Sequence, residues 1–292
     1  MKHKNKGFTL VEVMTAVAII AILVALLMPA LNMVRRMANE TSQKAQFAAI
    51  DMAVMAFRND FGDYPPSTLD TSFLSPNYYC GAQKLAEALL GWDLLGFHPK
   101  SEWRFDGLET KSGSPSGEWA YDPGKLRNGG LDTLHERRGP YLETSKANAF
   151  RLGDLFASTG NLTAGPSSVM CDVFAVKQVA IGGKTVKAGT PILYYKAETS
   201  SKVFAQPASA ADQSVIYNAF DNQDLIILGK MTETLIPHPL VNIANLYNFD
   251  SAGGIRDPKI TTVPWPYRPD SYVLISAGAD GLYGTSDDIH NF

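Results

Sequence analysis

The chain has 292 residues, of which 45% are hydrophobic and 19% charged, and its formal net charge is −3. This composition suits a folded domain of mixed structure with a sizeable core. It argues against a general DNA-binding protein, because such proteins need clustered lysine and arginine, so we expect no nucleic-acid partner.

A basic leader precedes a long apolar segment. Lys2, Lys4 and Lys6 come before a run from Phe8 to Met28, in which Glu12 is the one charged residue. At about 1.5 Å per residue, this run is long enough to span a hydrocarbon core of about 30 Å. Because basic flanks stay in the cytoplasm, we expect the rest of the chain to lie outside the membrane.

Glu12 needs a partner or a proton, since a carboxylate at the centre of a spanning helix costs about 2.5 to 3.5 kcal/mol. Cleavage after Gly7 would give Phe8 a free amine. A neighbouring copy, shifted along the helix axis, would then set its amine against Glu12. One charge pair would define the stagger between subunits.

The segment Lys-Gly-Phe-Thr-Leu-Val-Glu, from Lys6 to Glu12, resembles the amino-terminal signature of type IV pilins and type II secretion pseudopilins. The resemblance implies that a prepilin peptidase cuts after Gly7 and methylates Phe8. It also implies a single pass through a bacterial inner membrane, with the globular domain in the periplasm. The implied partners are further copies of the chain, other pseudopilins and an inner-membrane assembly platform.

Two other interpretations of the amino terminus stay open. A secretory signal has an apolar core of about 7 to 15 residues before a small-x-small cleavage site. Here the run is longer, holds a glutamate and offers only a poor site at Met28-Pro29-Ala30. A plain membrane anchor would share the basic leader and the apolar helix, but it gives no reason for Glu12 to follow a Gly-Phe junction.

The helix is expected to continue beyond the membrane to Phe61, giving a length of roughly 80 Å. Gly62 and the prolines after it provide stop signals. Small or apolar residues recur in steps of three and four. This stripe consists of Val34, Ala38, Thr41, Ala45, Ala48, Met52 and Met55. In pilin-like folds the second half of the helix packs on its own domain, and we expect the stripe to serve this packing as well as subunit contacts.

These signals divide the chain into a leader, 1–7, a transmembrane half-helix, 8–30, an amphipathic half-helix, 31–62, and a globular domain, 63–292. The expected fold class is α+β, with the long helix packed on an antiparallel sheet domain with extended loops, as in pilins. An insertion covers about 67–138.

Within the domain, a short amphipathic helix is expected at 83–90, and the Gly-, Ser- and Pro-rich stretch 96–139 is expected to be mainly loop. Gly182-Gly183 has the composition of a hairpin turn. Strands enriched in β-branched and aromatic residues are expected at 173–179, 185–187, 192–195, 225–228 and 272–275.

Two cysteines, Cys80 and Cys171, lie in the part expected outside the cytoplasm, where oxidation is possible. A disulfide and two free thiols are both open. A metal site is disfavoured, because neither cysteine belongs to a Cys-x-x-Cys pair.

The second informative segment, residues 276–290, is rich in glycine and carries Asp280, Asp287 and Asp288. These carboxylates repel one another unless they are solvated or joined by a cation, and calcium accepts about six to eight oxygens in a flexible geometry. From the residues alone, a solvated acidic turn and a metal site are both open, and the spacing is not that of an EF-hand.

This segment also resembles the carboxy-terminal calcium-binding loop of the major type II secretion pseudopilins. The resemblance implies that Asp280, Asp287 and Asp288 supply side-chain ligands to calcium, with backbone carbonyls near Ala277 and Ile289. The usual major pseudopilin is much shorter than this chain, so a position in the filament shaft or at its tip is left open.

Motifs of common enzyme families are absent, including Gly-x-Ser-x-Gly, the Walker phosphate loop and His-Glu-x-x-His, so no enzyme is expected. Three functions are weighed. The first is a pseudopilin of a type II secretion system, and the acidic loop favours it. The second is a type IV pilin or minor pilin for adhesion, motility or DNA uptake. The third, a membrane-anchored enzyme or sensor, would need an uncleaved leader.

Overall fold

The computed structural model describes residues 9–69, 78–107, 120–121, 132–165, 167–248 and 254–292. It divides into two compact units, residues 1–41 and residues 42–292. Helix α1 (Leu10–Phe61) supplies the described part of the first unit and the opening segment of the second. The predicted long helix is therefore confirmed from Leu10 onward, and its predicted start at Phe8 lies outside the described residues.

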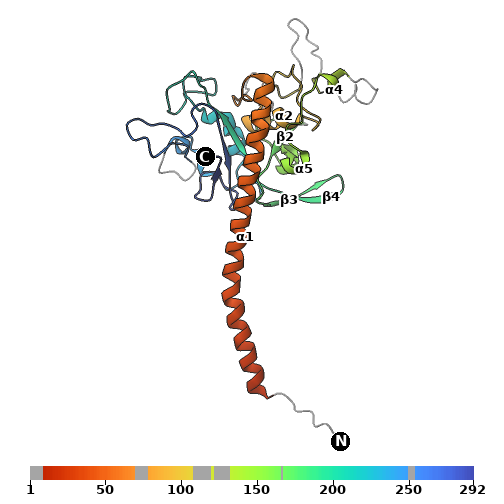
Figure 1. Cartoon of the computed structure of the whole chain (residues 1–292), viewed down its shortest axis with the longest axis vertical. Coiled ribbons are helices and arrows are strands. Elements are labelled where there is room, and N and C mark those ends of the chain that lie inside the picture. Colours follow the sequence, from red (N-terminus) through yellow and green to blue (C-terminus); the bar gives the residue numbers. More distant parts are fainter. Residues whose placement is uncertain (1–8, 70–77, 108–119, 122–131, 166, 249–253) are drawn as a thin grey trace. The chain divides into compact units, whose positions relative to one another are not determined.

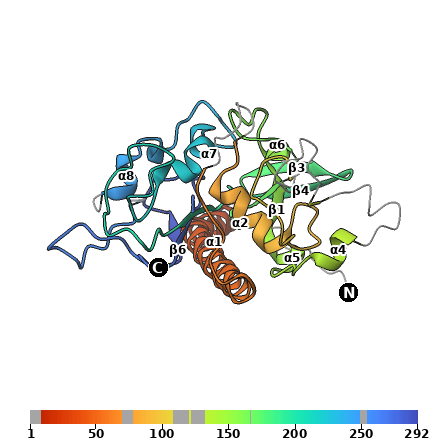
Figure 2. The same ribbon diagram turned by 90° about the horizontal axis from the view of Figure 1, so that it is seen from above.

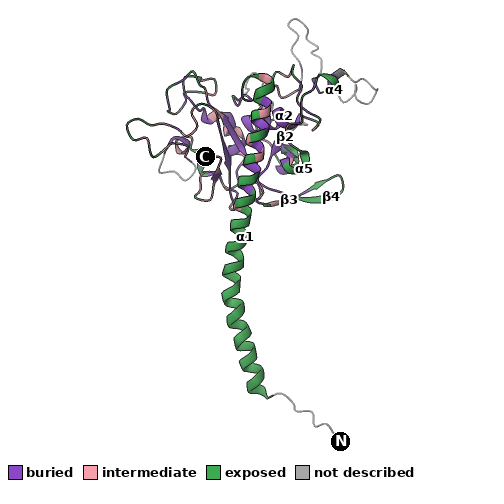
Figure 3. Ribbon diagram, viewed as in Figure 1, coloured by how far each residue is buried: buried purple, intermediate pink, exposed green. Residues whose placement is uncertain are grey.

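The first unit exposes all of its helical surface from Leu10 to Asn39 (Figure 3). By length and composition α1 can cross a membrane, and none of the side chains in its apolar window is buried. A helix that is apolar on every side requires an apolar environment. Its surroundings must therefore come from lipid or from other protein chains.

In the second unit, one face of α1 packs on the globular domain. Its buried residues are Gln43, Gln46, Phe47, Ile50, Ala53, Val54 and Phe57. Ala45, Ala48, Met52 and Met55 are exposed, so the prediction that their stripe packs on the domain is wrong. The face that carries the phenylalanines and Ile50 buries more apolar area than a face of alanines, which favours its packing inward.

A three-stranded antiparallel sheet lies at the centre of the domain, in the order β5 (Leu193–Lys196), β6 (Tyr272–Ser276) and β7 (Ile289–His290). Side chains alternate between its two faces, as the strand period of two requires. Tyr194, Tyr272 and Leu274 join the core that includes α1 and α2 (Gly81–Leu90), whereas their neighbours along each strand join a second core. Strands predicted at 192–195 and 272–275 are confirmed.

Two antiparallel hairpin-like pairs flank this sheet, β1 (Ala149–Arg151) with β2 (Ser168–Met170), and β3 (Lys177–Ile181) with β4 (Lys184–Ala188). Ile181 pairs with Lys184 across Gly182-Gly183, which confirms the predicted turn. Viewed from above, the remaining short helices lie on both sides of α1 (Figure 2). They are α4 (Asp132–Glu136), α5 (Thr144–Ala147), α6 (Leu152–Leu155), η1 (Ala219–Asn222), α7 (Gln223–Ile227), η2 (Pro239–Val241) and α8 (Ala244–Tyr247).

Two strand predictions need correction. The strand expected at 225–228 is helix α7, because η1 leads directly into it and buries the adjacent pair Leu225 and Ile226. Four apolar residues in a row do not distinguish a strand from a turn of helix. The strand expected at 173–179 begins only at Lys177. The α+β class itself is confirmed, with a long amino-terminal helix and small antiparallel sheets.

Helix α2 confirms the prediction at 83–90 but is buried on every side. Its Glu87 accepts hydrogen bonds from the hydroxyl groups of Tyr79, at 2.9 Å, and Tyr121, at 3.0 Å, and a further one from Ser101. Burial raises the pKa of Glu87. Glu87 and its three partners all lie within 67–138, so these bonds hold described parts of that stretch together.

Candidate functional site

The described chain starts next to the predicted cleavage site, since Gly7 and Phe8 themselves lie outside the described residues. Thr9 precedes the first turn of α1. Its N–H and its hydroxyl donate hydrogen bonds to Oε2 of Glu12, at 2.8 and 2.7 Å. In return, the N–H of Glu12 donates to Oγ1 of Thr9, at 3.2 Å. This reciprocal pair is a helix capping box.

The capping box gives Glu12 a partner on its own chain, in addition to the partner predicted on a neighbouring copy. Its signal was present in the sequence, because Thr-x-x-Glu at Thr9 to Glu12 is the capping-box pattern. Among the described residues, the contacts of the carboxylate involve Oε2 alone. The second oxygen therefore stays available to another group.

The three predicted aspartates meet in one loop, between β6 and β7. Asp287 accepts hydrogen bonds through Oδ2 from the N–H of Asp280, at 2.9 Å, and through Oδ1 from the hydroxyl of Thr285, at 2.6 Å. Asp288 accepts through Oδ2 from the N–H of Gly284, at 2.7 Å. The loop is thus tied together by its own carboxylates.

Both ends of this loop are fixed by the sheet. Ser276 at the end of β6 pairs with Ile289 at the start of β7, and the adjoining Ala277 is buried. Gly278 has φ +63°, and a Cβ atom there would lie 2.2 Å from the carbonyl oxygen of Asp287. A glycine is therefore required for the close turn. The backbone near Ala277 and Ile289, named as possible ligands, lies at the base of the loop.

The loop concentrates negative charge. Burial, reinforced by the charges of Asp287 and Asp280, raises the pKa of Asp288 to about 8. Burial also raises the pKa of Asp280, with a contribution from Asp287. For Asp287, burial acts upward, but hydrogen bonds from Thr285 and Asp280 outweigh it and lower the pKa. A cation would relieve this repulsion.

The donor set fits a hard cation such as calcium, because all three side chains offer carboxylate oxygens on a glycine-rich loop. Their arrangement is not yet that of a coordination shell. Within the described ranges, no group of three His, Cys, Asp or Glu side chains is gathered around a point that could hold a metal. Several of the carboxylate oxygens accept hydrogen bonds from amides and a hydroxyl instead.

Comparison with known proteins identifies a family motif at the amino terminus. Residues 2–28 match the model of the prokaryotic N-terminal methylation motif. The amino terminus thus carries the methylation motif of prepilin-like proteins. No curated protein and no solved structure matches the chain. The motif indicates processing by prepilin peptidase, anchoring in a membrane and assembly with related subunits.

The globular domain also contains a buried acid that the sequence did not single out. Asp172 accepts hydrogen bonds through Oδ1 from the N–H groups of Phe174 and Thr190, and through Oδ2 from the hydroxyl of Ser276. Burial raises its pKa to about 8, and the charge of Asp287 contributes. Asp172 thus connects Ser276, at the base of the acidic loop, to the segments of the same chain that carry Phe174 and Thr190. The local sequence does not predict this role, because two of its three partners, Thr190 and Ser276, come from distant segments.

The two cysteines, Cys80 and Cys171, are both free and buried in the same hydrophobic cluster. Burial raises the pKa of both thiols, that of Cys80 to about 12. Neither has the exposed, electropositive surroundings of a reactive thiol. In this structure they act as core residues.

Proposed function

We propose that this prepilin-like precursor is a structural subunit of a type II secretion pseudopilus. In this proposal prepilin peptidase cuts after Gly7 and methylates Phe8, and the mature chain assembles at the bacterial inner membrane into a helical filament that supports protein export. The observation that carries the proposal is the methylation motif over residues 2–28, joined to a helix whose apolar surface is uncovered from Leu10 to Asn39.

Glu12 connects processing with assembly in this proposal. The cap from Thr9 orients the carboxylate through Oε2 and leaves Oε1 for the methylated amine of Phe8 on a neighbouring copy. The two charges stabilise each other most strongly away from water. Assembly would thus satisfy an acid that is otherwise costly within the membrane.

Calcium binding by the acidic loop is a separate part of the proposal. Asp280, Asp287 and Asp288 would be the side-chain ligands, with carbonyls near Ala277 and Ile289. Binding would replace some of the hydrogen bonds that these carboxylates now accept and would neutralise their repulsion. The basis is the concentration of acids in one loop and the raised pKa of Asp288.

The calcium proposal is tested by thermal unfolding of the purified full chain with calcium and with a chelator. We expect the chelator to lower the melting temperature of the wild type and to have no effect on Asp287→Ala. Asp270→Ala, a substitution at an exposed turn of the same domain, should keep the wild-type response. An Asp287→Ala variant with the full calcium response would show that the ligand assignment is wrong.

The secretion role is tested in the source bacterium by deleting the gene and measuring both exported proteins and surface pili. We expect export to be lost and pili to remain, and export to return with the wild-type chain but not with Glu12→Leu. Loss of pili or motility with intact export would favour the type IV pilin alternative. Full complementation by Glu12→Leu would contradict the role given to Glu12.

A further inference from the structure

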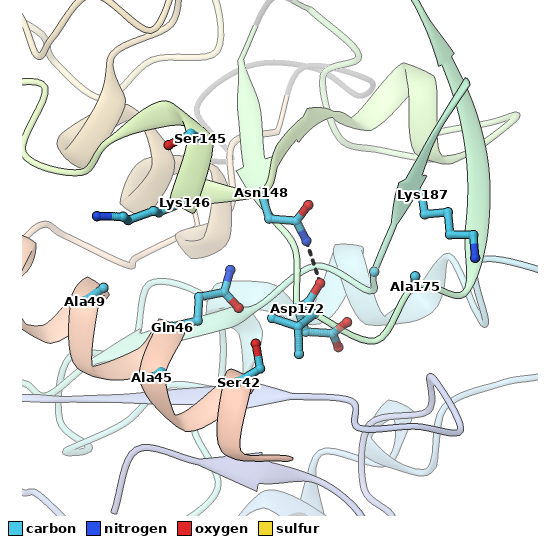
Figure 4. A pocket seen from close by; sticks show the side chains of 12 residues that line it. Ser42, Ala45, Gln46, Ala49, Ser145, Lys146, Asn148, Asp172, Ala175 and Lys187 are labelled. Carbon is cyan, nitrogen blue, oxygen red and sulfur yellow. Dashed lines mark hydrogen bonds between the residues drawn. The ribbon is translucent and has the colours of Figure 1, made fainter. Parts of the chain in front are cut away.

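Two cavities of the second unit differ in how the chain uses their buried acids. The larger of the two, of about 460 Å³, is lined by α1, α5 and β4, and Figure 4 shows Gln46, Lys146 and Lys187 around it. Its buried acid is Asp172, which accepts hydrogen bonds on both carboxylate oxygens. The acid of this cavity is therefore satisfied within the chain. The smaller cavity contains a buried acid that is not.

The smaller cavity, of about 220 Å³, lies at the end of β5, and its lining is mainly polar. It is formed by three segments that are far apart in the sequence, 66–68, 196–198 and 210–221. Three of the lining residues are acids, Glu198, Asp212 and Asp221. Lys196 also lines the cavity, but its ammonium group donates a hydrogen bond to Asp63, which does not. The cavity therefore has an excess of negative charge.

Asp221, in η1, gives an independent sign that the cavity receives a ligand. This residue is 3% exposed, and its Oδ2 accepts a hydrogen bond from the hydroxyl of Ser67. Its Oδ1 is buried as well. The N–H of Leu69 acts on the carboxylate, but no hydrogen bond of standard geometry reaches Oδ1 in the part of the chain that the structure describes. A buried acceptor without a hydrogen bond is destabilising, so a donor that enters the cavity would be stabilising there.

The charge of Asp221 is only partly compensated by the chain. Burial raises its pKa to about 7, although Ser67, Lys84 and Leu69 act in the opposite direction. Lys84 of α2 donates its ammonium group to the carbonyl of Thr68, at 2.6 Å, and is not among the lining residues. A cation inside the cavity would favour the ionised form of Asp221.

The other two acids contribute in different ways. Glu198 is partly exposed, and its contacts among the described residues, with the N–H and the hydroxyl of Ser200, involve Oε1 alone. Asp212 accepts hydrogen bonds on both oxygens, from Ser214 and from the N–H of Ala208. Asp212 therefore adds charge, whereas Glu198 and Asp221 each keep one oxygen for a further donor.

The arrangement suits a primary ammonium group better than other cations. Such a group has three donors that point in different directions. Within the described ranges, no three His, Cys, Asp or Glu side chains gather around one point that could hold a metal ion. A guanidinium group is favoured where a carboxylate offers both oxygens in parallel, and here Oδ2 of Asp221 is already bonded to Ser67.

We propose that this cavity binds the primary ammonium group of a ligand, and that buried Asp221 and partly exposed Glu198 accept its hydrogen bonds. The ammonium group belongs either to a free small amine or to a lysine side chain of another protein, since both present the same chemistry. The site does not depend on the proposed function, because neither the methylation motif nor Glu12 contributes to it.

The test is ligand-observed NMR on the full chain in micelles, with n-butylammonium as the probe and n-butanol as a neutral molecule of the same length. We expect butylammonium to bind and butanol not to bind. Asp221→Asn should weaken the binding of butylammonium about tenfold, because the acceptor loses its charge. Asp270→Asn, which changes an exposed acid outside the cavity, should bind like the wild type. Equal binding by Asp221→Asn and the wild type would overturn the proposal.

A second probe, the blocked peptide acetyl-Gly-Lys-Gly-amide, distinguishes the two sources of the ammonium group. Tighter binding of the peptide than of butylammonium indicates a protein lysine, and the reverse indicates a free amine. Binding of neither probe would overturn the proposal. Loss of the butylammonium signal on addition of an equal concentration of calcium would overturn the choice of an amine over a metal ion.

Glu198→Gln keeps the test decisive if Asp221→Asn does not fold, as judged by its melting curve. Glu198 is partly exposed, so its substitution should leave the melting temperature unchanged. We expect this variant to bind butylammonium more weakly than the wild type. Unchanged binding in a folded Glu198→Gln variant would show that this carboxylate does not accept a hydrogen bond from the ligand and would contradict the proposed site.

Discussion

The two halves of α1 are both rich in apolar residues, yet only one of them is buried within its own chain. Residues 10–39 are exposed on all sides, whereas Phe47, Ile50 and Phe57 anchor the second half in the core of the domain. The first half is apolar around the axis, and the second concentrates its largest side chains on one face. Apolar content alone thus does not predict burial within the chain, whereas the placement of large side chains on one face does.

The largest expected effect compares Phe57→Ala with Leu23→Ala. Phe57 is 2% exposed and packs edge-on against Phe97 with ring centroids 5.2 Å apart. Its truncation should lower the free energy of unfolding by about 3–5 kcal/mol. Leu23 is 53% exposed, and its truncation should change the value by less than about 0.5 kcal/mol. Denaturant unfolding of the chain in micelles measures both, and equal losses would erase the distinction between the halves.

The next comparison is between the two acids of α1, Asp51 in its second half and Glu12 in its first half. Asp51 accepts a hydrogen bond from the hydroxyl of Tyr272 at 2.6 Å and lies 3.5 Å from Arg268. Asp51→Ala should destabilise the domain by about 1–3 kcal/mol, because it leaves buried donors unpaired. Glu12→Gln should leave the melting temperature unchanged and reduce assembly roughly tenfold, equivalent to about 1.4 kcal/mol per contact. If Glu12→Gln lowered the melting temperature and Asp51→Ala did not, the stabilising role of Asp51 and the assembly role of Glu12 would both be refuted.

The stability of the second unit, residues 42–292, should depend on pH. Burial raises the pKa of Asp221 to about 7 from 3.8, although a hydrogen bond from Ser67 acts in the opposite direction. The folded chain therefore keeps this proton up to about pH 7, while the unfolded chain releases it near pH 4. Stability should fall as the pH rises through this window, by roughly 1.4 kcal/mol per pKa unit at most. Melting temperatures at pH 5 and pH 7.5 should differ less in Asp221→Asn than in the wild type, and an unchanged difference would contradict this.

The smallest effect concerns the first turn of α1. Thr9→Val removes the hydroxyl of the capping box and should destabilise that turn by about 1 kcal/mol, which speeds amide exchange at its first residues about fivefold. Thr15→Val is the matched control, because the hydroxyl of Thr15 donates to the carbonyl of Glu12, three residues earlier, and caps no helix end. Equal exchange rates in the two variants would contradict a stabilising role of the Thr9 hydroxyl in the first turn of α1.

Much of the architecture was predictable from local patterns. The long helix, α2, the hairpin at Gly182-Gly183 and strands β5 and β6 each follow from periodicity or turn chemistry within a few residues. The gathering of Asp280, Asp287 and Asp288 in one loop also follows, since they lie close together in sequence.

The remaining features depend on contacts between distant segments. The covered face of α1 is set by the domain that packs on it, so the regular alanines and methionines suggested the wrong face. Asp172 becomes part of the loop's base only because Thr190 and Ser276 fold against it. Leu225 and Ile226 form a helix because η1 precedes them. The Thr9 cap, by contrast, is predictable from the local Thr-x-x-Glu pattern alone.

The central claim is that the chain is a processed, filament-forming subunit. It is tested most directly by the mass of the amino-terminal peptide of the protein extracted from membranes. The account predicts a chain that begins at N-methylated Phe8. A peptide that still begins at Met1, or one that begins near Ala30, would contradict it.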